Sequence, residues 1–125
     1  MTKVVVSDDH PHARRVLKLR LEQAGYDVHL AADGRAALEL VRAIHPQAVV
    51  TDLKMPDMSG EDLCRALQAD GLLPELHVLV VTSCADRVLR ARLTAYPGVG
   101  VVEKPFSPNE VCAWLNGRLS PEVSA

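Results

Sequence analysis

Five short apolar runs, rich in β-branched residues, recur along the sequence and constrain its fold more than any other feature. They cover residues 4–6, 27–31, 48–51, 77–81 and 99–102. Their apolar residues are continuous rather than alternating, which is typical of strands buried on both faces of a parallel sheet. Longer segments separate the runs, so the order of elements predicts an α/β fold with helices on both faces of the sheet.

The separating segments carry the signals of helices. From Pro11 to Ala24, apolar residues recur at a spacing of three to four and charged residues take the other faces. Pro11 suits the first turn of such a helix, and Gly25 suits its end. Further helices are predicted at residues 34–44, 61–69, 87–95 and 108–119.

Length and composition fit one globular domain. The chain has 125 residues, of which 48% are hydrophobic and 24% charged, a balance that predicts independent folding. We expect the domain to span residues 1–119, and residues 120–125 to be a tail or the start of a linker. The apolar run near the N-terminus is too short for a signal peptide or a membrane span, which predicts a cytoplasmic protein that does not enter a membrane.

Charge and cysteine content exclude other classes of protein. The net charge is -2 with the two signs interspersed, so direct binding of nucleic acid is disfavoured. Three widely spaced cysteines, Cys64, Cys84 and Cys112, suit neither a disulfide framework nor a paired metal site. We expect reduced thiols, with Cys64 and Cys112 acting as small buried hydrophobic residues.

Polar residues stand at or just beyond the ends of four predicted strands. They are Asp8, Asp9, Asp52, Thr82 and Lys104. Ligands of open parallel sheets bind at the carboxyl ends of the strands, so these side chains should converge. Three carboxylates in one cleft repel one another unless a cation neutralises them, and Mg²⁺ prefers oxygen ligands of this kind.

Such a site suits phosphoryl transfer. An aspartate oxygen can attack phosphorus and form an acyl phosphate, while a metal ion screens the charge on the transferred group. Lys104 would bring a cation to the phosphoryl oxygens, and Thr82 would bring a hydroxyl donor.

The chain resembles the receiver domains of two-component response regulators, in particular those of the chemotaxis-regulator type. The motifs that carry this resemblance stand in the family's order and spacing between Lys3 and about Leu119. They are the pair Asp8-Asp9, the segment DLKMPDMSG from Asp52 to Gly60, the pair Thr82-Ser83, and Lys104-Pro105-Phe106.

The resemblance implies a flavodoxin-like, doubly wound sheet with strand order 2-1-3-4-5 and five helices. It implies that Asp52 is the phosphoacceptor, that Thr82 is the switch hydroxyl, and that Lys104 pairs with the phosphoryl group. The backbone N–H groups of Leu53 and Ser83 would donate to the phosphoryl oxygens.

The resemblance also implies a Mg²⁺ site. Asp9 and Asp52 would bind the ion directly, Asp8 would act mostly through water, and the backbone carbonyl of Lys54 would complete the protein ligands. A histidine kinase or a phosphotransfer protein would supply the phosphoryl group. The output would be a downstream protein or a domain outside this chain, with a homodimer as a further possibility. The chain would catalyse its own phosphorylation and dephosphorylation, so we do not class it as an enzyme.

Several positions depart from the family pattern. Val101 stands where the family usually has an aromatic residue whose rotation reports phosphorylation, and a valine cannot swing in that way. The stretch Tyr96–Gly100 replaces a turn of small residues, and Pro97 fixes a backbone angle there. Lys54 and Cys84 border the mouth of the site, where we expect them to tune the lifetime of the phosphoryl group.

Each candidate residue has a plainer alternative role. Asp8 and Asp9 can simply cap the helix that follows them. His10 and His12 lie close to the acidic pair and suggest a transition-metal site, yet histidines beside a helix start are most often exposed residues without a ligand role.

Three other functions compete with the receiver interpretation. A phosphatase of the haloacid dehalogenase type also forms an aspartyl phosphate, but it needs a second aspartate where Lys54 stands. A flavin carrier on the same sheet would need hydroxyls and amides where Asp8 and Asp9 stand. A constitutive protein-interaction domain that has lost phosphorylation is disfavoured by the complete acidic cluster.

Overall fold

The structure is a computed structural model, and it describes residues 1–83 and 86–119. Two sequence expectations lie outside the described residues, namely the role of Cys84 and the nature of the tail at residues 120–125. Within the described ranges, no helix has both the length and the apolar character needed to cross a membrane.

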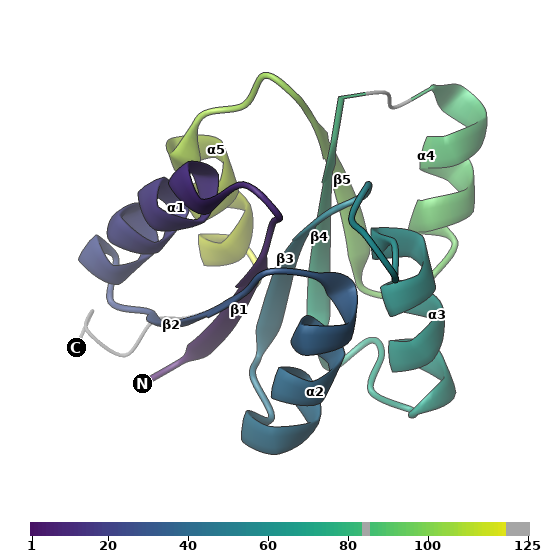
Figure 1. Cartoon of the computed structure of the whole chain (residues 1–125), viewed down its shortest axis with the longest axis horizontal. Coiled ribbons are helices and arrows are strands. Elements are labelled where there is room, and N and C mark those ends of the chain that lie inside the picture. Colours follow the sequence, from purple (N-terminus) through teal and green to yellow (C-terminus); the bar gives the residue numbers. More distant parts are fainter. Residues whose placement is uncertain (84–85, 120–125) are drawn as a thin grey trace.

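A five-stranded parallel sheet forms the centre of the molecule (Figure 1). Its strands are β1 (Lys3–Ser7), β2 (Asp27–Ala31), β3 (Ala48–Asp52), β4 (His77–Thr82) and β5 (Val99–Glu103). Their order across the sheet is β2-β1-β3-β4-β5, as predicted. The chain moves outward from β1 to the edge at β2 and then returns to the other side of β1, so the winding direction reverses between β1 and β3.

Helices cover both faces of the sheet (Figure 1). One layer holds α1 (Pro11–Gln23) and α5 (Pro108–Asn116), and the other holds α2 (Gly34–Ile44), α3 (Gly60–Ala69) and α4 (Arg87–Thr94). Successive strand residues point to opposite faces, so Val4 and Val6 pack in the first layer and Val5 in the second. This doubly wound arrangement explains why the central strands are apolar throughout.

Both described cysteines are part of this core. Cys64 packs in the layer of α2, α3 and α4, and Cys112 packs in the layer of α1 and α5. Both are free thiols and almost fully buried, which confirms the expectation for these two residues. Burial raises the pKa of the Cys64 thiol to about 12, so it has little thiolate character at neutral pH.

The element bounds agree with the predicted ones to within a few residues. β3 and β4 each extend one residue further than predicted and end on Asp52 and Thr82. The last helix ends at Asn116 rather than at Leu119, with Gly117 as its C-cap residue. Glycine has a low helix propensity, which accounts for the early end.

Trp114, the single tryptophan of the chain, packs against the edge strand β5. A Cβ atom added at Gly100 would lie 2.7 Å from the Trp114 Nε1 atom and 2.8 Å from its Cζ2 atom. The Arg118 guanidinium also lies over the indole, 4.0 Å from the ring centroid, at cation–π distance. The missing side chain at Gly100 therefore makes room for the indole.

We predict that Gly100→Ala displaces the Trp114 indole and destabilises the fold by about 1 kcal/mol, since overpacking forces a shifted side chain. Urea unfolding gives the free energy, and the emission maximum of the single tryptophan reports its exposure. Gly117→Ala is the matched control, because its nearest atoms would lie 3.5 Å away, at ordinary contact distance. An unchanged emission spectrum in Gly100→Ala would contradict the packing described for the indole.

Candidate functional site

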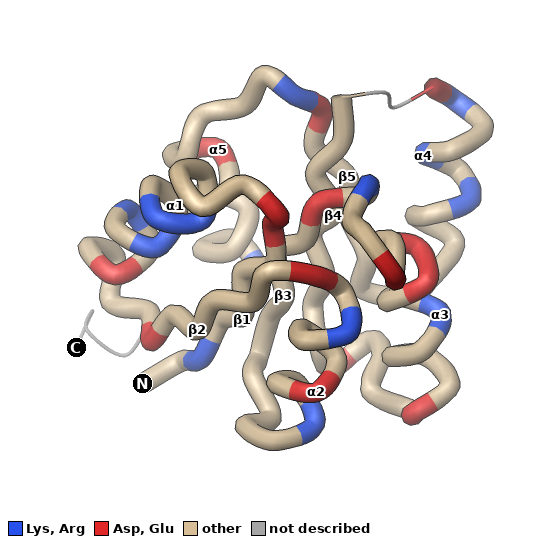
Figure 2. The backbone as a smooth tube through the Cα atoms, viewed as in Figure 1, with Lys and Arg blue, Asp and Glu red and all other residues tan. Residues whose placement is uncertain are grey.

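Four strand ends bring the predicted site residues to one edge of the sheet. Asp8 follows β1 directly, Asp52 and Thr82 are the last residues of β3 and β4, and Lys104 follows β5. Acidic segments, red in Figure 2, lie near one another where β1 and β3 end. Asp8, Asp52 and Thr82 expose only 5%, 6% and 2% of their surface, so this polar cluster is largely removed from water.

Both carboxylate oxygens of Asp52 have partners. The Nζ atom of Lys104 lies 3.1 Å from Oδ2, and the Leu53 amide donates to Oδ1 over 2.9 Å. The same Leu53 amide also donates to the carbonyl of Val81 on the neighbouring strand, again over 2.9 Å. The carboxylate is therefore oriented from two sides, by a cation and by a backbone donor fixed to the sheet.

Burial raises the pKa of Asp52 above the ordinary aspartate value. The hydrogen bond and the charge of Lys104 act in the opposite direction, and the nearby carboxylate of Asp8 adds to the increase. The net direction shows that one lysine does not fully compensate the desolvation of this carboxylate. A further positive charge near Asp52 would therefore stabilise its carboxylate.

Lys104 is tied to the sheet as well as to Asp52. Its amide donates to the carbonyl of Thr82 over 2.7 Å, which continues the β4–β5 ladder past the end of the strand. The two residues predicted to contact a phosphoryl group are thus held side by side next to Asp52. Their roles toward such a group stay predictions.

The loop after β3 packs tightly beneath the site. The amide of Gly60 donates to the carbonyl of Leu53 over 2.8 Å, and a Cβ atom at Gly60 would lie 2.6 Å from the carbonyl oxygen of Asp52. Met55 turns inward, with its sulfur 3.1 Å from the hydroxyl of the buried Ser7. The loop that contains Met55 and Gly60 therefore packs against β1 and β3 and helps to hold Asp52 in position.

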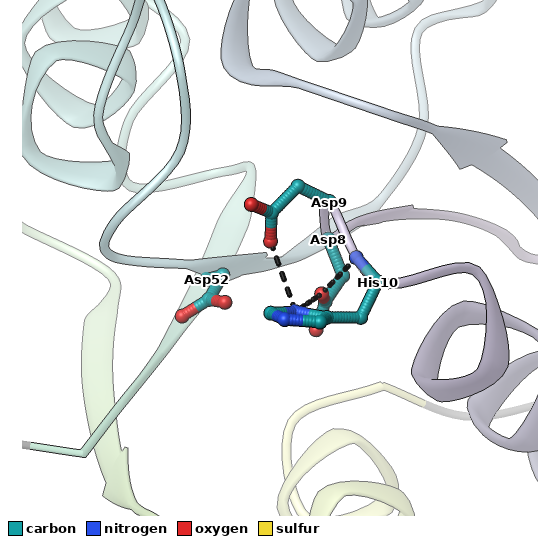
Figure 3. Close-up of side chains that lie close together, drawn as sticks. All are labelled: Asp8, Asp9, His10 and Asp52. Carbon is teal, nitrogen blue, oxygen red and sulfur yellow. Dashed lines mark hydrogen bonds and ion pairs between the residues drawn. The ribbon is translucent and has the colours of Figure 1, made fainter.

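Asp8, Asp9 and Asp52 offer a set of oxygen ligands (Figure 3). One ligand atom of each, together with one nitrogen of His10, lies within 4.8 Å of all the others. Hard divalent cations bind carboxylate oxygens, and a partly buried carboxylate cluster gains most from such a cation. The donor set fits Mg²⁺, with Asp9, at the more exposed rim of the cluster, open to solvent ligands.

The alternative that the acidic pair merely caps α1 finds no support. The N-cap residue of α1 is His10, its side chain forms no cap hydrogen bond, and no acidic residue lies in the first turn of this helix. The Asp8 carboxylate instead accepts from the amide of His10 over 2.8 Å. Its own carbonyl accepts from Nη1 of Arg14 over 2.6 Å, so α1 holds the acidic turn in place.

Arg14 is a site residue that the sequence interpretation missed, and His10 is one that it considered and disfavoured as a ligand. The His10 side chain is 70% exposed, as expected, but its Nδ1 lies 3.2 Å from Asp8 Oδ1 and 3.0 Å from Asp9 Oδ1. Arg14 appeared only as one of several polar residues on an amphipathic helix. Their spacing from Asp8 in the sequence could have indicated this contact. Pro11 starts a helix, and the first turn of that helix must lie next to the turn that holds Asp8 and Asp9.

Three further predicted residues lie at the mouth of the site. Lys54 is exposed and lines an open groove together with Asp9 and Leu53. Ser83 is exposed just after β4. The role of the Lys54 carbonyl as a metal ligand stays a prediction. The same holds for the amides of Leu53 and Ser83 as donors to a phosphoryl group, although the Leu53 amide already donates to the Asp52 carboxylate.

The unusual Val101 lies half-buried on β5 beneath α4. Its carbonyl accepts from Nη1 of Arg90 over 3.2 Å, which joins α4 to β5. On its other side α4 is joined to α3, because Arg92 forms two hydrogen bonds, of 2.7 and 2.8 Å, with the carboxylate of Glu61. Polar contacts of two arginines thus hold α4 on both flanks.

We predict that, without divalent ions, Asp52→Asn raises the thermal stability of the domain at neutral pH. The folded pKa of Asp52 is raised, so its charged form destabilises the fold above that pKa. The destabilisation disappears as the pH falls from the raised pKa of folded Asp52 to the pKa of about 4 that an aspartate has in the unfolded chain. The stability advantage of the variant should shrink over the same pH range.

Melting temperatures between neutral and acidic pH test this expectation, with Asp57→Asn as a control on the same loop. Asp57 is exposed and has a φ of 68°, a conformation that asparagine also tolerates. A lower stability of Asp52→Asn at every pH would mean that the Lys104 pair outweighs the burial of the carboxylate.

Comparisons with known proteins point to one family. The model of the response regulator receiver domain matches residues 4–116. A probable transcriptional regulator, ycf27, of Porphyridium aerugineum is 38% identical over 117 residues, which cover 94% of this chain and 48% of that protein. The DNA-binding response regulator MtrA of Mycolicibacterium smegmatis is 36% identical, with 94% and 50% covered. The chain therefore spans about half the length of these relatives.

Solved structures agree with the sequence match. The chemotaxis response regulator CheY4 of Vibrio cholerae superposes with a TM-score of 0.86 at 28% identity, covering 95% of this chain and 99% of that one. Its likeness thus extends over nearly the whole of both chains. From the match over residues 4–116 and the common fold, we conclude that this chain belongs to the response regulator receiver domain family.

Proposed function

We propose that this receiver domain accepts a phosphoryl group on Asp52 from a histidine kinase or a phosphotransfer protein. The observation that carries the proposal is the buried Asp52 carboxylate at the end of β3, contacted by Lys104 and surrounded by two further aspartates. This combination supports the proposal, because it brings a carboxylate, a cation and further carboxylate oxygens together at one edge of the sheet.

In the proposed transfer, an Asp52 carboxylate oxygen attacks phosphorus while the bond to the nitrogen or oxygen of the donor breaks. The electron pair of that bond leaves with the donor, and an acyl phosphate remains on Asp52. Lys104, 3.1 Å from Oδ2, neutralises charge that passes from the carboxylate to the phosphoryl oxygens. The Leu53 amide, just after β3, and the Thr82 hydroxyl, at the end of β4, are the proposed donors.

Mg²⁺ is the proposed cofactor of this reaction. Asp9 and Asp52 would hold it directly, with Asp8 acting mostly through water and the Lys54 carbonyl completing the protein ligands. When bound, the ion would screen the negative charge of the transferring group. It would also offset the desolvation that leaves Asp52 with a raised pKa.

Nothing in the site favours the phosphatase alternative, because Lys54 occupies the place of the second aspartate and lies exposed at the groove. A constitutive interaction domain would not need a buried carboxylate cluster, which costs stability when it is not neutralised. We therefore keep phosphorylation as the proposed function, with signalling rather than turnover of a separate product as its purpose.

The output of this receiver is proposed to lie outside the chain. One of its relatives is named a probable transcriptional regulator and another a DNA-binding response regulator, and the chain covers about half of their length. A downstream protein, or a domain joined after the receiver at residues 1–119, would read the phosphorylated state. A homodimer and the predicted cytoplasmic location both stay predictions.

The first test is the intact mass of the protein after incubation with acetyl phosphate, with and without Mg²⁺. We expect the native chain to gain one phosphoryl group in a Mg²⁺-dependent manner and Asp52→Asn to gain none. Asp57→Asn, on the same loop, should be labelled like the native chain. Labelling of Asp52→Asn, or no labelling of the native chain with excess donor, would contradict the proposal.

A second prediction concerns Lys104. Lys104→Met removes the cation beside Asp52, and we expect labelling to slow by about a hundredfold, as for the loss of one preorganised charge-stabilising donor. Lys18→Met, on α1, removes a lysine away from the strand ends and is the control. Quenched time points analysed by mass give both rates. Equal rates for the two variants would show that Lys104 does not act on the transferred group.

A further inference from the structure

An ion pair joins α3 and α4, which lie side by side on one face of the sheet (Figure 1). A groove of about 530 Å³ lies next to this pair, with Glu61, Leu89 and Arg92 among its lining residues. A second hollow, of about 320 Å³, is lined by Gln68 of α3 and by Arg92 and Ala95. Because Arg92 lines both hollows, its contact with Glu61 bridges a region in which the two helices are not closely packed.

The pair has the parallel, two-bonded geometry that is specific to arginine and a carboxylate. Nε of Arg92 donates to Oε2 of Glu61 over 2.7 Å, and Nη2 donates to Oε1 over 2.8 Å. The Glu61 side chain is only 15% exposed, whereas that of Arg92 is 55% exposed. Since α4 buries a single side chain, Leu93, its position against α3 depends on this pair more than the position of a well-packed helix would.

The groove beside the pair extends to the residues next to Asp52. Leu53 and Lys54, which follow Asp52 in the chain, line the same groove as Glu61 and Arg92. The Leu53 amide donates to the Asp52 carboxylate, so this end of the groove borders the carboxylate directly. A change of charge on Asp52 therefore acts on both members of the ion pair along one open groove.

We propose that the ion pair between Arg92 and Glu61 is a latch, which holds α4 against α3 in the unphosphorylated domain and opens when Asp52 carries a phosphoryl group. The inference rests on the proposed function, because it concerns the regulation that follows from the same reaction. Phosphorylation replaces the single charge of the carboxylate by about two negative charges on the phosphoryl oxygens. The added charge repels Glu61 and attracts Arg92, so the two side chains are drawn apart and α4 is released.

Coupling of this kind is reciprocal, so loss of the latch must favour the phosphorylated state. Beryllium fluoride with Mg²⁺ is the probe, because it binds a carboxylate reversibly as a mimic of the phosphoryl group, and fluorine NMR gives its affinity. We expect Arg92→Gln and Glu61→Gln each to bind it about threefold more tightly, the size expected for one partly exposed ion pair. The double variant should gain no more than either single variant, because both remove the same interaction.

The sign of the effect separates a latch from a simple effect of charge. Loss of the positive charge of Arg92 would by itself weaken the binding of an anion, whereas loss of the negative charge of Glu61 would strengthen it. A latch predicts tighter binding in both variants. Arg42→Gln is the matched control, since Arg42 is also 55% exposed and forms the same kind of pair with Asp70, away from the groove. This variant should keep the affinity of the native chain.

Unchanged or weaker binding in Arg92→Gln would overturn the inference, as would additive gains in the double variant or an equal gain in Arg42→Gln. Circular dichroism verifies that each variant is folded. In each of these cases the proposed function still stands if the native chain binds beryllium fluoride and is labelled by acetyl phosphate. If the native chain does neither, the proposed function fails, and the latch fails with it.

Discussion

The burial of carboxylates at one edge of the sheet is the constraint on which the rest of the structure depends. Parallel strands end at one edge, so Asp8 and Asp52 meet there with little access to water. Lys104 supplies one positive charge, and the raised pKa of Asp52 shows that this charge does not restore the solvation lost on burial. An uncompensated buried carboxylate costs stability, and a cation bound beside it would offset that cost.

The remainder of the molecule keeps that edge rigid. Valines on alternating faces of β1 and β3 anchor the strands in both helical layers, so a strand end cannot shift without disturbing packing on each side. The turn after β3 is fixed by the close approach of Gly60 to the carbonyl of Asp52. Preorganisation of this kind lets a small domain hold reactive groups at fixed distances without a bound partner.

The sequence predicted the fold and the meeting of the strand ends because both follow from the order of buried strands. Asp52, Thr82 and Lys104 could be placed together without coordinates, since parallel strands share one carboxyl edge. The position of His10 could not, because it depends on a side-chain rotamer and on a backbone contact with Asp8. The end of α5 at Asn116 was likewise missed, since helix ends depend on a few weak contacts.

The unequal anchoring of the helices has a consequence for how the domain opens. α4 buries a single side chain, Leu93, whereas α3 buries Gly60, Leu63, Cys64 and Leu67. Leu89 of α4 is half-buried against the same layer, and the helix is otherwise held by exposed arginine contacts such as Arg92 with Glu61, which contribute little free energy in water. Amide protons of α4 should therefore exchange with solvent through local opening before those of α3, so the local opening of α4 costs less free energy than that of α3.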